Sequence, residues 1–272
     1  MQKILFLEKG GIRLLLFCAF FVMFFCLCVF FFHNFAQFCG FQIMIIKRNM
    51  KIALIGYGKM GHIIESIALQ RGHEIVCIID KDNTDDFSCE AFASADVAIE
   101  FTTPHTAEQN IQLAWKAGVP VVCGTTGWNV EAMRQEAMRR DVGLMWSSNY
   151  SIGVNLLFAM NQRLADLLKP YPDYQPHITE VHHIHKLDAP SGTAKTLQEA
   201  IGSDRLKVED IQSIREGEVP GLHTVTWDSA IDTITLSHNA KSREGFALGA
   251  VIAAEWMKDK KGWHTFAEAI LG

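Results

Sequence analysis

The feature that most constrains the fold of this chain is a glycine-rich turn that directly follows a short apolar run. Residues 51–55 read Lys-Ile-Ala-Leu-Ile, and Gly56-Tyr57-Gly58-Lys59-Met60-Gly61 comes next. Apolar residues then recur at helical spacing from Ile63 to Ala68, and Gly72 is suited to end that helix. A strand, a G-x-G-x-x-G turn and a helix in this order predict a dinucleotide-binding unit of an α/β sheet.

Each glycine of the turn has a separate physical role in such a unit. Gly56 permits the tight turn, Gly58 lets the backbone approach a pyrophosphate, and Gly61 lets the helix pack closely on the strand. Asp80 and Lys81 follow the next apolar run. An aspartate there can accept hydrogen bonds from an adenosine ribose, whereas a lysine can meet a 2′-phosphate, so the pair predicts NADH with NADPH tolerated. A glycine-rich turn that binds no ligand is the alternative.

Strand-like and helical segments keep alternating as far as residue 150. The pattern predicts further strands at 97–101, 120–123 and 143–146, and helices at about 107–117 and 129–140. Gly124-Thr125-Thr126 and Ser147-Ser148-Asn149-Tyr150 follow two of these strands. The carboxyl ends of parallel strands form the binding crevice of a doubly wound sheet, so both loops are candidate cofactor contacts, although either can be an ordinary loop.

The pattern changes at about residue 151. A long helix is expected at 154–168, and strand-like alternation then dominates at 178–184, 211–215, 222–228 and 231–237. Helices are expected again at about 243–258 and 264–271. We therefore predict an α/β chain, in which a Rossmann-like doubly wound parallel sheet is joined to an α+β domain with a mixed or antiparallel sheet.

Residues 180–194 are the most informative for chemistry. Three histidines and a lysine lie within five residues, at His182, His183, His185 and Lys186. Pro190-Ser191-Gly192-Thr193 then opens a predicted helix, in which Ser191 is a good N-cap and the N–H groups of Gly192 and Thr193 point outward. With positive charge from Lys186 and a histidine, these amides predict an anion pocket that suits a carboxylate or dicarboxylate substrate.

A metal site is the competing interpretation of the three histidines. On a strand, His182 and His183 point to opposite faces, so both cannot bind one ion while the strand stays regular. No nearby cysteine or glutamate pair completes a ligand set, and we expect no metal. A solvated histidine-rich strand is the remaining alternative.

Residues 1–50 differ in composition from the rest of the chain. They hold 12 of the 18 phenylalanines, 4 of the 7 cysteines and only six charged residues. Residues 12–32 carry a single charge and are long enough to span a bilayer as a helix, whereas the basic residues before them also fit a signal peptide. Met50 directly precedes the first strand, so we expect a misassigned start, with residues 1–49 as an apolar extension. A membrane anchor is the alternative.

The remaining residues, 51–272, form an acidic chain with ordinary composition. They hold 20 basic and 29 acidic residues, and this net negative charge does not favour binding to nucleic acid. Their cysteines, Cys77, Cys89 and Cys123, are odd in number and lack C-x-x-C spacing, so they predict neither a disulfide framework nor a zinc site. A reducing compartment and a cytoplasmic location are expected.

Residues 180–194 resemble the signature of the 4-hydroxy-tetrahydrodipicolinate reductase family, also called the dihydrodipicolinate reductase family, of bacterial lysine biosynthesis. The family pattern E-[IVA]-x-E-x-H-x-x-x-K-x-D-x-P-S-G-T-A is matched from Glu180 to Ala194, with His177 in place of its first glutamate. The resemblance extends over residues 50–272 and covers nothing before them. It includes residues 56–61, 124–126, 149–155 and 242–251.

The resemblance implies NAD(P)H-dependent reduction of 4-hydroxy-tetrahydrodipicolinate to tetrahydrodipicolinate, with loss of water, in the diaminopimelate route. It implies proton-donor positions at His182 and Lys186 and substrate contacts at His183, Gly192 and Thr193. Arg243 matches a family arginine near the domain junction, whose role stays open. The implied cofactor contacts are residues 56–61, Asp80, Lys81, residues 124–126 and residues 147–150.

The resemblance also implies the domain organisation and the assembly. Residues 50–150 and 240–272 are then the dinucleotide-binding domain, and residues 151–239 are the substrate-binding and tetramerisation domain of a homotetramer. Two other classes of function remain as alternatives. One is a non-catalytic NAD(P)H-binding sensor on the same fold, and the other is a membrane-tethered scaffold, which rests on residues 1–49 alone.

Overall fold

A computed structural model describes residues 49–272 of the chain. The interpretations of the N-terminal extension fall on residues 1–48, which lie outside the described residues, apart from Asn49 at its end. Within residues 49–272, every helix is too short or too polar to cross a bilayer.

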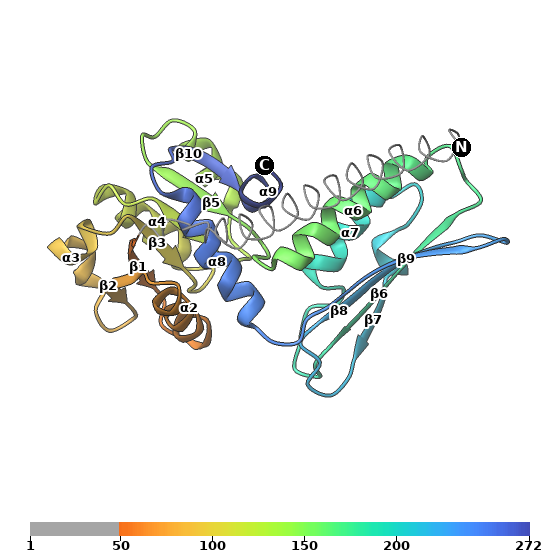
Figure 1. Ribbon diagram of the computed structural model, residues 1–272, viewed down its shortest axis with the longest axis horizontal. Coiled ribbons are helices and arrows are strands. Elements are labelled where there is room, and N and C mark those ends of the chain that lie inside the picture. Colours follow the sequence, from red (N-terminus) through yellow and green to blue (C-terminus); the bar gives the residue numbers. More distant parts are fainter. Residues whose placement is uncertain (1–48) are drawn as a thin grey trace, which may run out of the picture. The chain divides into compact units, whose positions relative to one another are not determined.

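The larger of two sheets has six strands, all parallel, in the order β10-β5-β4-β3-β1-β2 (Figure 1). The chain turns back across the sheet between β1 and β3, which makes it doubly wound. The predicted parallel sheet is therefore confirmed. Its strands are β1 (Lys51–Ile55), β2 (Glu74–Ile79), β3 (Val97–Glu100), β4 (Val121–Cys123), β5 (Gly143–Trp146) and β10 (Gly262–Thr265).

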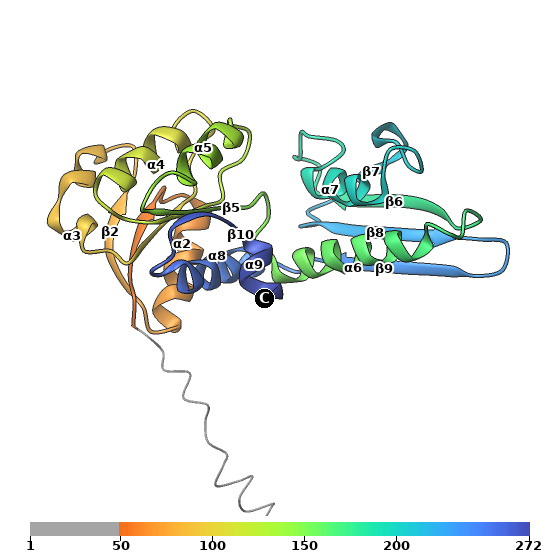
Figure 2. The same ribbon diagram turned by 90° about the horizontal axis from the view of Figure 1, so that it is seen from above.

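Helices cover both faces of this sheet (Figure 2). Along β1, Ile52 and Leu54 pack into one hydrophobic core, and Ala53 and Ile55 pack into the other. Burial on both faces explains why these strands are continuous apolar runs in the sequence. One face is covered by α2 (Lys59–Gln70), α8 (Glu244–Met257) and α9 (Phe266–Leu271), and the other by α3 (Glu90–Ala93), α4 (Ala107–Lys116) and α5 (Val130–Ala137), with the 3₁₀ turn η1 (Thr84–Ser88) before α3.

The second sheet has four strands in the order β7-β6-β8-β9, and it is mixed. β7 runs parallel to β6, whereas β8 pairs antiparallel with both β6 and β9. Its core contains Leu157, Leu197 and Trp227 from the two helices and the sheet, so α6 and α7 cover one face. The elements are α6 (Ile152–Leu168), β6 (Gln175–His182), α7 (Gly192–Ile201), the 3₁₀ turn η2 (Val208–Asp210), β7 (Gln212–Arg215), β8 (Leu222–Asp228) and β9 (Thr233–Asn239).

The end of the chain differs from the sequence expectation. A helix was expected over 264–271, but Gly262–Thr265 is the strand β10, and the helix α9 begins at Phe266. Thr265 and Glu268 form a capping box that sets the start of α9. β10 reads Gly-Trp-His-Thr and is partly exposed along its whole length, so it lacks the apolar run that marks the other strands of its sheet.

Candidate active site

The predicted cofactor loops lie along one edge of the six-stranded sheet. Gly56, Asp80, Gly124 and Ser147 follow β1, β2, β4 and β5, and parallel strands place their carboxyl ends at the same edge. Main-chain hydrogen bonds link these loops to neighbouring strands. Gly56 N donates to Ile79 O at 2.8 Å, and Ser147 N donates to Cys123 O at 3.3 Å.

The glycine turn has the geometry that a pyrophosphate group needs. Gly56 has φ +91°, and a Cβ on it would lie 2.1 Å from Phe101 O. A Cβ on Gly61 would lie 2.6 Å from Gly56 O, so the helix start packs directly on the turn. Gly58 is the N-cap of α2 without a side-chain cap, and a Cβ there would meet no atom within 4 Å. The uncapped helix start thus faces open space, which fits a bound anion.

The other residues of the turn and the acidic residue after β2 also surround this edge. Tyr57 packs its ring on His62 with centroids 4.0 Å apart, Lys59 is exposed, and Met60 packs partly against the core. Asp80 and Lys81 are both exposed. Lys81 N donates to Asp80 Oδ1 at 2.9 Å, so the main chain orients a carboxylate at the end of β2. This position suits contact with a ribose.

The Gly124-Thr125-Thr126 loop is held by two tryptophans. Trp128 Nε1 and Trp146 Nε1 donate to the same acceptor, Thr125 O, at 2.7 and 2.9 Å. Thr125 Oγ1 accepts from Thr102 N at 2.8 Å, so its hydroxyl is used inside the protein. A Cβ on Gly124 would lie 2.2 Å from the Phe101 ring, which requires glycine there. These contacts leave Thr126 to face outward.

The loop after β5 divides its residues between core and cavity. Ser147 Oγ donates to Asn149 O at 2.8 Å, and Asn149 Nδ2 donates to Thr193 Oγ1 at 3.2 Å. Tyr150 is 2% exposed, and its hydroxyl donates to Cys123 O at 2.9 Å. The Tyr150 side chain therefore belongs to the core. Only its main-chain atoms can make the predicted cofactor contact.

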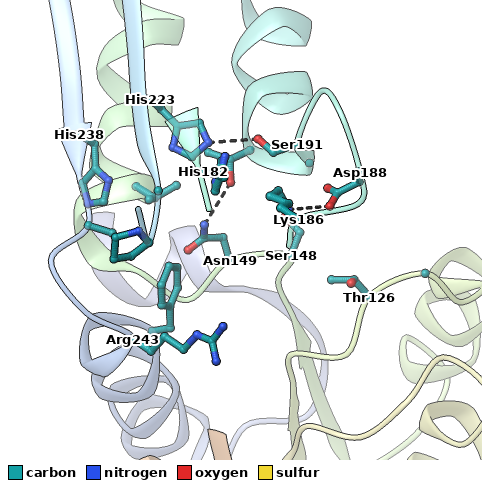
Figure 3. Close-up of a pocket in the computed structure, with 18 of the residues that line it drawn as sticks. Thr126, Ser148, Asn149, His182, Lys186, Asp188, Ser191, His223, His238 and Arg243 are labelled. Atoms are coloured by element: carbon teal, nitrogen blue, oxygen red, sulfur yellow. Dashed lines mark hydrogen bonds and ion pairs between the residues drawn. The ribbon is translucent and has the colours of Figure 1, made fainter. Parts of the chain in front are cut away.

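A cavity of about 570 Å³ gathers most of the chemically important residues. Figure 3 shows His182, Lys186 and Ser191 facing the same space as Thr126 and Arg243, which come from the other part of the fold. The glycine turn, Asp80 and Lys81 are not among its lining residues. The predicted residues that line it are Thr126, Ser148, Asn149, His182, His183, Lys186, Gly192, Thr193 and Arg243.

One end of the cavity is built to receive an anion. Ser191 caps α7, and its Oγ accepts from Ala194 N at 3.2 Å. The N–H groups of Gly192 and Thr193 have no partner within the helix because they begin it, and both residues line the cavity. Lys186 Nζ lies 2.7 Å from Asp188 Oδ1. Burial raises the pKa of Asp188, but the hydrogen bond and charge of Lys186 outweigh it and lower the pKa, so Asp188 is an anion.

A buried carboxylate supports His182 from behind. Glu180 is fully buried, and its Oε1 accepts from Ser191 N at 3.2 Å and from Arg215 Nη2 at 2.9 Å. Its Oε2 forms an ion-pair contact with His182 Nδ1. Burial raises the pKa of Glu180, but hydrogen bonds from His182 and Arg215 outweigh it and hold the pKa well below its usual range. Glu180 is therefore an anion.

A second histidine completes the cluster. His223 is 4% exposed, its ring lies 5.0 Å from that of His182, and its Nε2 is 3.1 Å from Ser191 Oγ. Burial, with a further contribution from the charge of His182, lowers the pKa of His223 to about 4. His223 is thus neutral near pH 7 and acts as a hydrogen-bonding group.

Sequence reasoning assigned no role to Glu180, Arg215 or His223. The sequence carries a signal that Glu180 lies beside His182. Residues two apart on a strand share a face, and Glu180 precedes His182 by two. The other two have no local signal. Arg215 is opposite His182 in the β6–β7 register, and His223 is opposite Glu180 in the β6–β8 register.

The same cluster has the spacing of a metal site, although no metal is expected from the sequence. Donor atoms of Glu180, His182 and His223 all lie within 4.8 Å of one another. The guanidinium of Arg215 already neutralises Glu180, however, and a divalent cation beside it would be repelled. The charge balance of these described residues favours holding a proton over holding a metal ion.

Comparison with known protein families finds two matches that together span most of the described residues. The family model described as "Dihydrodipicolinate reductase, N-terminus" matches residues 50–150. The model described as "Dihydrodipicolinate reductase, C-terminus" matches residues 153–270. The boundary between the two matches lies at the start of α6.

Individual proteins show the same similarity. The chain is 44% identical over 235 residues to a 4-hydroxy-tetrahydrodipicolinate reductase of Christiangramia forsetii, which covers 81% of this chain and 98% of the relative. It is 34% identical to the protein of that name from Thermosipho africanus, with the same coverage. Among solved structures, a dipicolinate-bound dihydrodipicolinate reductase from Paenisporosarcina sp. TG-14 superposes with a TM-score of 0.67 at 23% identity, covering 82% of this chain and 99% of that one.

Proposed function

The chain belongs to the dihydrodipicolinate reductase family, and we propose on this premise that the cavity around His182 and Lys186 is its active site. The reaction is the nicotinamide-nucleotide-dependent reduction of 4-hydroxy-tetrahydrodipicolinate to tetrahydrodipicolinate. Substrate, reduced nucleotide and one proton give product, oxidised nucleotide and water. The observation that supports the site most directly is that one cavity combines a histidine, a lysine and a helix start.

The edge of the six-stranded sheet is the proposed nucleotide site. The N–H groups at the start of α2 bind the pyrophosphate, and Asp80 accepts hydrogen bonds from the adenosine ribose. The loops that contain Thr126 and Ser148 lead from this edge into the cavity, so they are the proposed contacts to the nicotinamide half. Lys81 is exposed beside Asp80 and can meet a 2′-phosphate, so we expect both NADH and NADPH to be used, with NADH preferred.

The opposite side of the cavity is the proposed substrate site. The amides of Gly192 and Thr193 bind one carboxylate of the substrate, and Lys186 and His183 bind the other polar groups. A bound reduced nucleotide would supply the hydride. Loss of water from the 4-hydroxy substrate gives a conjugated C=C–C=N system, and hydride addition to that system leaves negative charge, which His182 or Lys186 neutralises by giving up a proton. An imidazole is suited to this step because it changes charge near neutral pH.

The same proposal extends to domains, assembly and location. Residues 50–150 and 240–272 bind the nucleotide, and residues 151–239 bind the substrate and join four copies into a homotetramer. Supporting this, β10 returns to the six-stranded sheet, and one face of the four-stranded sheet has no helix on it among the described residues. Cys77, Cys89 and Cys123 are free thiols, which fits a reducing cytoplasm.

Turnover of the purified full chain tests the proposal. The preceding synthase generates the substrate in place from pyruvate and aspartate semialdehyde, and loss of NADH or NADPH is followed by absorbance. We expect His182→Ala to lower kcat by about 10²- to 10⁴-fold, because it removes the proton donor. His185→Ala is the matched control, since that side chain is 70% exposed and does not line the cavity.

Two results would contradict the proposal. Wild-type protein that binds NADH but does not oxidise it with this substrate would favour the sensor. A His182→Ala variant with the wild-type rate would remove His182 from the mechanism.

A further inference from the structure

We propose that Glu180 is a positioning residue that sets which nitrogen of His182 carries the transferable proton, and that Arg215 holds Glu180 in place for this task. The inference rests on the proposed function, because it takes His182 as the proton donor. Glu180 is fully buried and does not line the cavity, so it acts only through the histidine.

Nδ1 of His182 is closed off by the carboxylate of Glu180. This nitrogen faces Glu180 Oε2, and both atoms are buried. Among the described residues, Nδ1 has no other partner. An ionised carboxylate only accepts hydrogen bonds. Nδ1 must therefore keep its hydrogen in both charge states of the imidazole. A proton that leaves His182 then comes from Nε2.

Nε2 of His182 lies on the cavity side, beside a glycine. A Cβ on Gly221 would lie 3.1 Å from His182 Nε2, and Gly221 lines the cavity beside it. The missing side chain of this glycine leaves the nitrogen open on the cavity side. The two nitrogens of His182 thus have opposite environments, one closed by a carboxylate and one open to substrate.

Arg215 and the main chain of Ser191 hold Glu180 in place. Arg215 donates to Glu180 Oε1 at 2.9 Å, and the same guanidinium donates to Lys186 O at 3.3 Å and Asp188 O at 2.6 Å. One side chain therefore connects the support of His182 to the backbone of the loop that bears Lys186. The N–H of Ser191 is a second donor to Glu180 Oε1, so the anion pocket is connected as well.

The donation step balances with this arrangement. The N–H bond at Nε2 breaks, a bond from that hydrogen to the substrate anion forms, and the electron pair stays on Nε2. The imidazolium becomes a neutral imidazole protonated at Nδ1, which is the tautomer that Glu180 stabilises. No oxidant or further reactant is needed.

The principal test replaces Glu180 by Gln and by Asp. We expect Glu180→Gln to lower kcat by about 10- to 100-fold with less than about threefold change in KM, since orientation and not substrate binding is lost. Glu180→Asp keeps the charge and should recover part of the rate. Glu218→Gln is the matched control, because Glu218 also pairs with a histidine, at 3.2 Å, but both side chains are largely exposed. Its kcat should stay within about twofold of wild type.

A double-mutant cycle separates this inference from the proposed function. In a His182→Ala background, Glu180→Gln should have no further effect, because its action passes through the imidazole. If His182→Ala keeps the wild-type rate, the proposed function fails at that residue. If His182→Ala abolishes turnover while folded Glu180→Gln keeps it, the proposed function stands and the positioning role is overturned.

A spectroscopic measurement on wild-type protein keeps the inference testable even if Glu180→Gln does not fold. Long-range ¹H–¹⁵N spectra at a pH where imidazoles are neutral report the tautomer of His182. We expect a pyrrole-type shift at Nδ1 and a pyridine-type shift at Nε2. The reverse pattern would overturn the proposal.

Discussion

His223 shows how the burial of one side chain sets its chemistry. Its pKa falls from an ordinary value of 6.5 to about 4, mainly because burial disfavours the charged form and partly because His182 lies beside it. Glu180 meets the same burial but stays charged, since Arg215 and His182 bond to it. The difference between the two residues is the presence of a compensating partner, and not the depth of burial.

His223 gives a prediction for stability as a function of pH. Between about pH 6.5 and about pH 4 the unfolded chain binds a proton at this residue that the folded chain does not. The free energy of unfolding should therefore fall as pH falls through this window. His223→Gln removes the titration, so its free energy of unfolding should fall less steeply. Urea unfolding at several pH values and one protein concentration measures both slopes, and equal slopes would contradict the assignment.

At the scale of elements, α2 and α8 are connected by a charged cluster. Arg71, the C-cap of α2, donates to both oxygens of Glu255 on α8, at 2.8 and 2.7 Å. The buried His73 lies 2.7 Å from the same carboxylate. Burial raises the pKa of Glu255, but the bonds from Arg71 and His73 outweigh it and lower the pKa. This cluster links α2, the first helix of the proposed nucleotide site, to α8, which begins beside Arg243.

The cluster predicts a pH-dependent loss of stability. Glu255→Gln should lower the free energy of unfolding at neutral pH by about 1–2 kcal/mol, because a partly exposed charged hydrogen bond is removed. The folded pKa is below the ordinary value of 4.5, so the wild-type advantage is complete above that value and is lost as pH falls through the folded pKa. Urea unfolding measures the difference, with the exposed Glu199→Gln as control. If wild type stays more stable than Glu255→Gln at a pH below the folded pKa of Glu255, the role assigned to this ionised carboxylate is contradicted.

At the scale of the whole molecule, the four-stranded sheet is the most informative feature. α6 and α7 cover one face, and alternate residues of β8 and β9 point the other way. They are Leu222, Thr224, Thr226, Asp228, Thr233, Thr235, Ser237 and Asn239, and most of these side chains are short and polar. The proposed tetramer requires that the same sheet of a second copy packs on this face.

A charge on this face tests the tetramer. Thr226 lies opposite Thr235 in the β8–β9 register, so Thr226→Arg places a bulky cation at the middle of the surface. We expect light scattering to show a smaller assembly than the wild-type protein. Gln135→Arg, on the exposed side of α5, should leave the mass unchanged. A monomeric wild-type protein, or a tetramer that tolerates Thr226→Arg, would refute this interface.

The sequence alone determined the features that depend on neighbouring residues. The strand, glycine turn and helix of residues 51–70 were predicted because apolar spacing and glycine conformation are local properties. Ser191 was predicted as an N-cap for the same reason, and it caps α7. The alternation of strands and helices predicted the parallel sheet, since a buried strand is recognisable by its own composition.

Tertiary structure decided which distant residues meet. β10 joins the large sheet only through its pairing with β5, and its own residues carry no strand signal. Arg215 and His223 reach His182 and Glu180 because β7 and β8 pair with β6 in one register. A shift of one residue would turn these side chains to the other face. Register is a property of the packed sheet, and for this reason the support of His182 could not be derived from the order of residues along the chain.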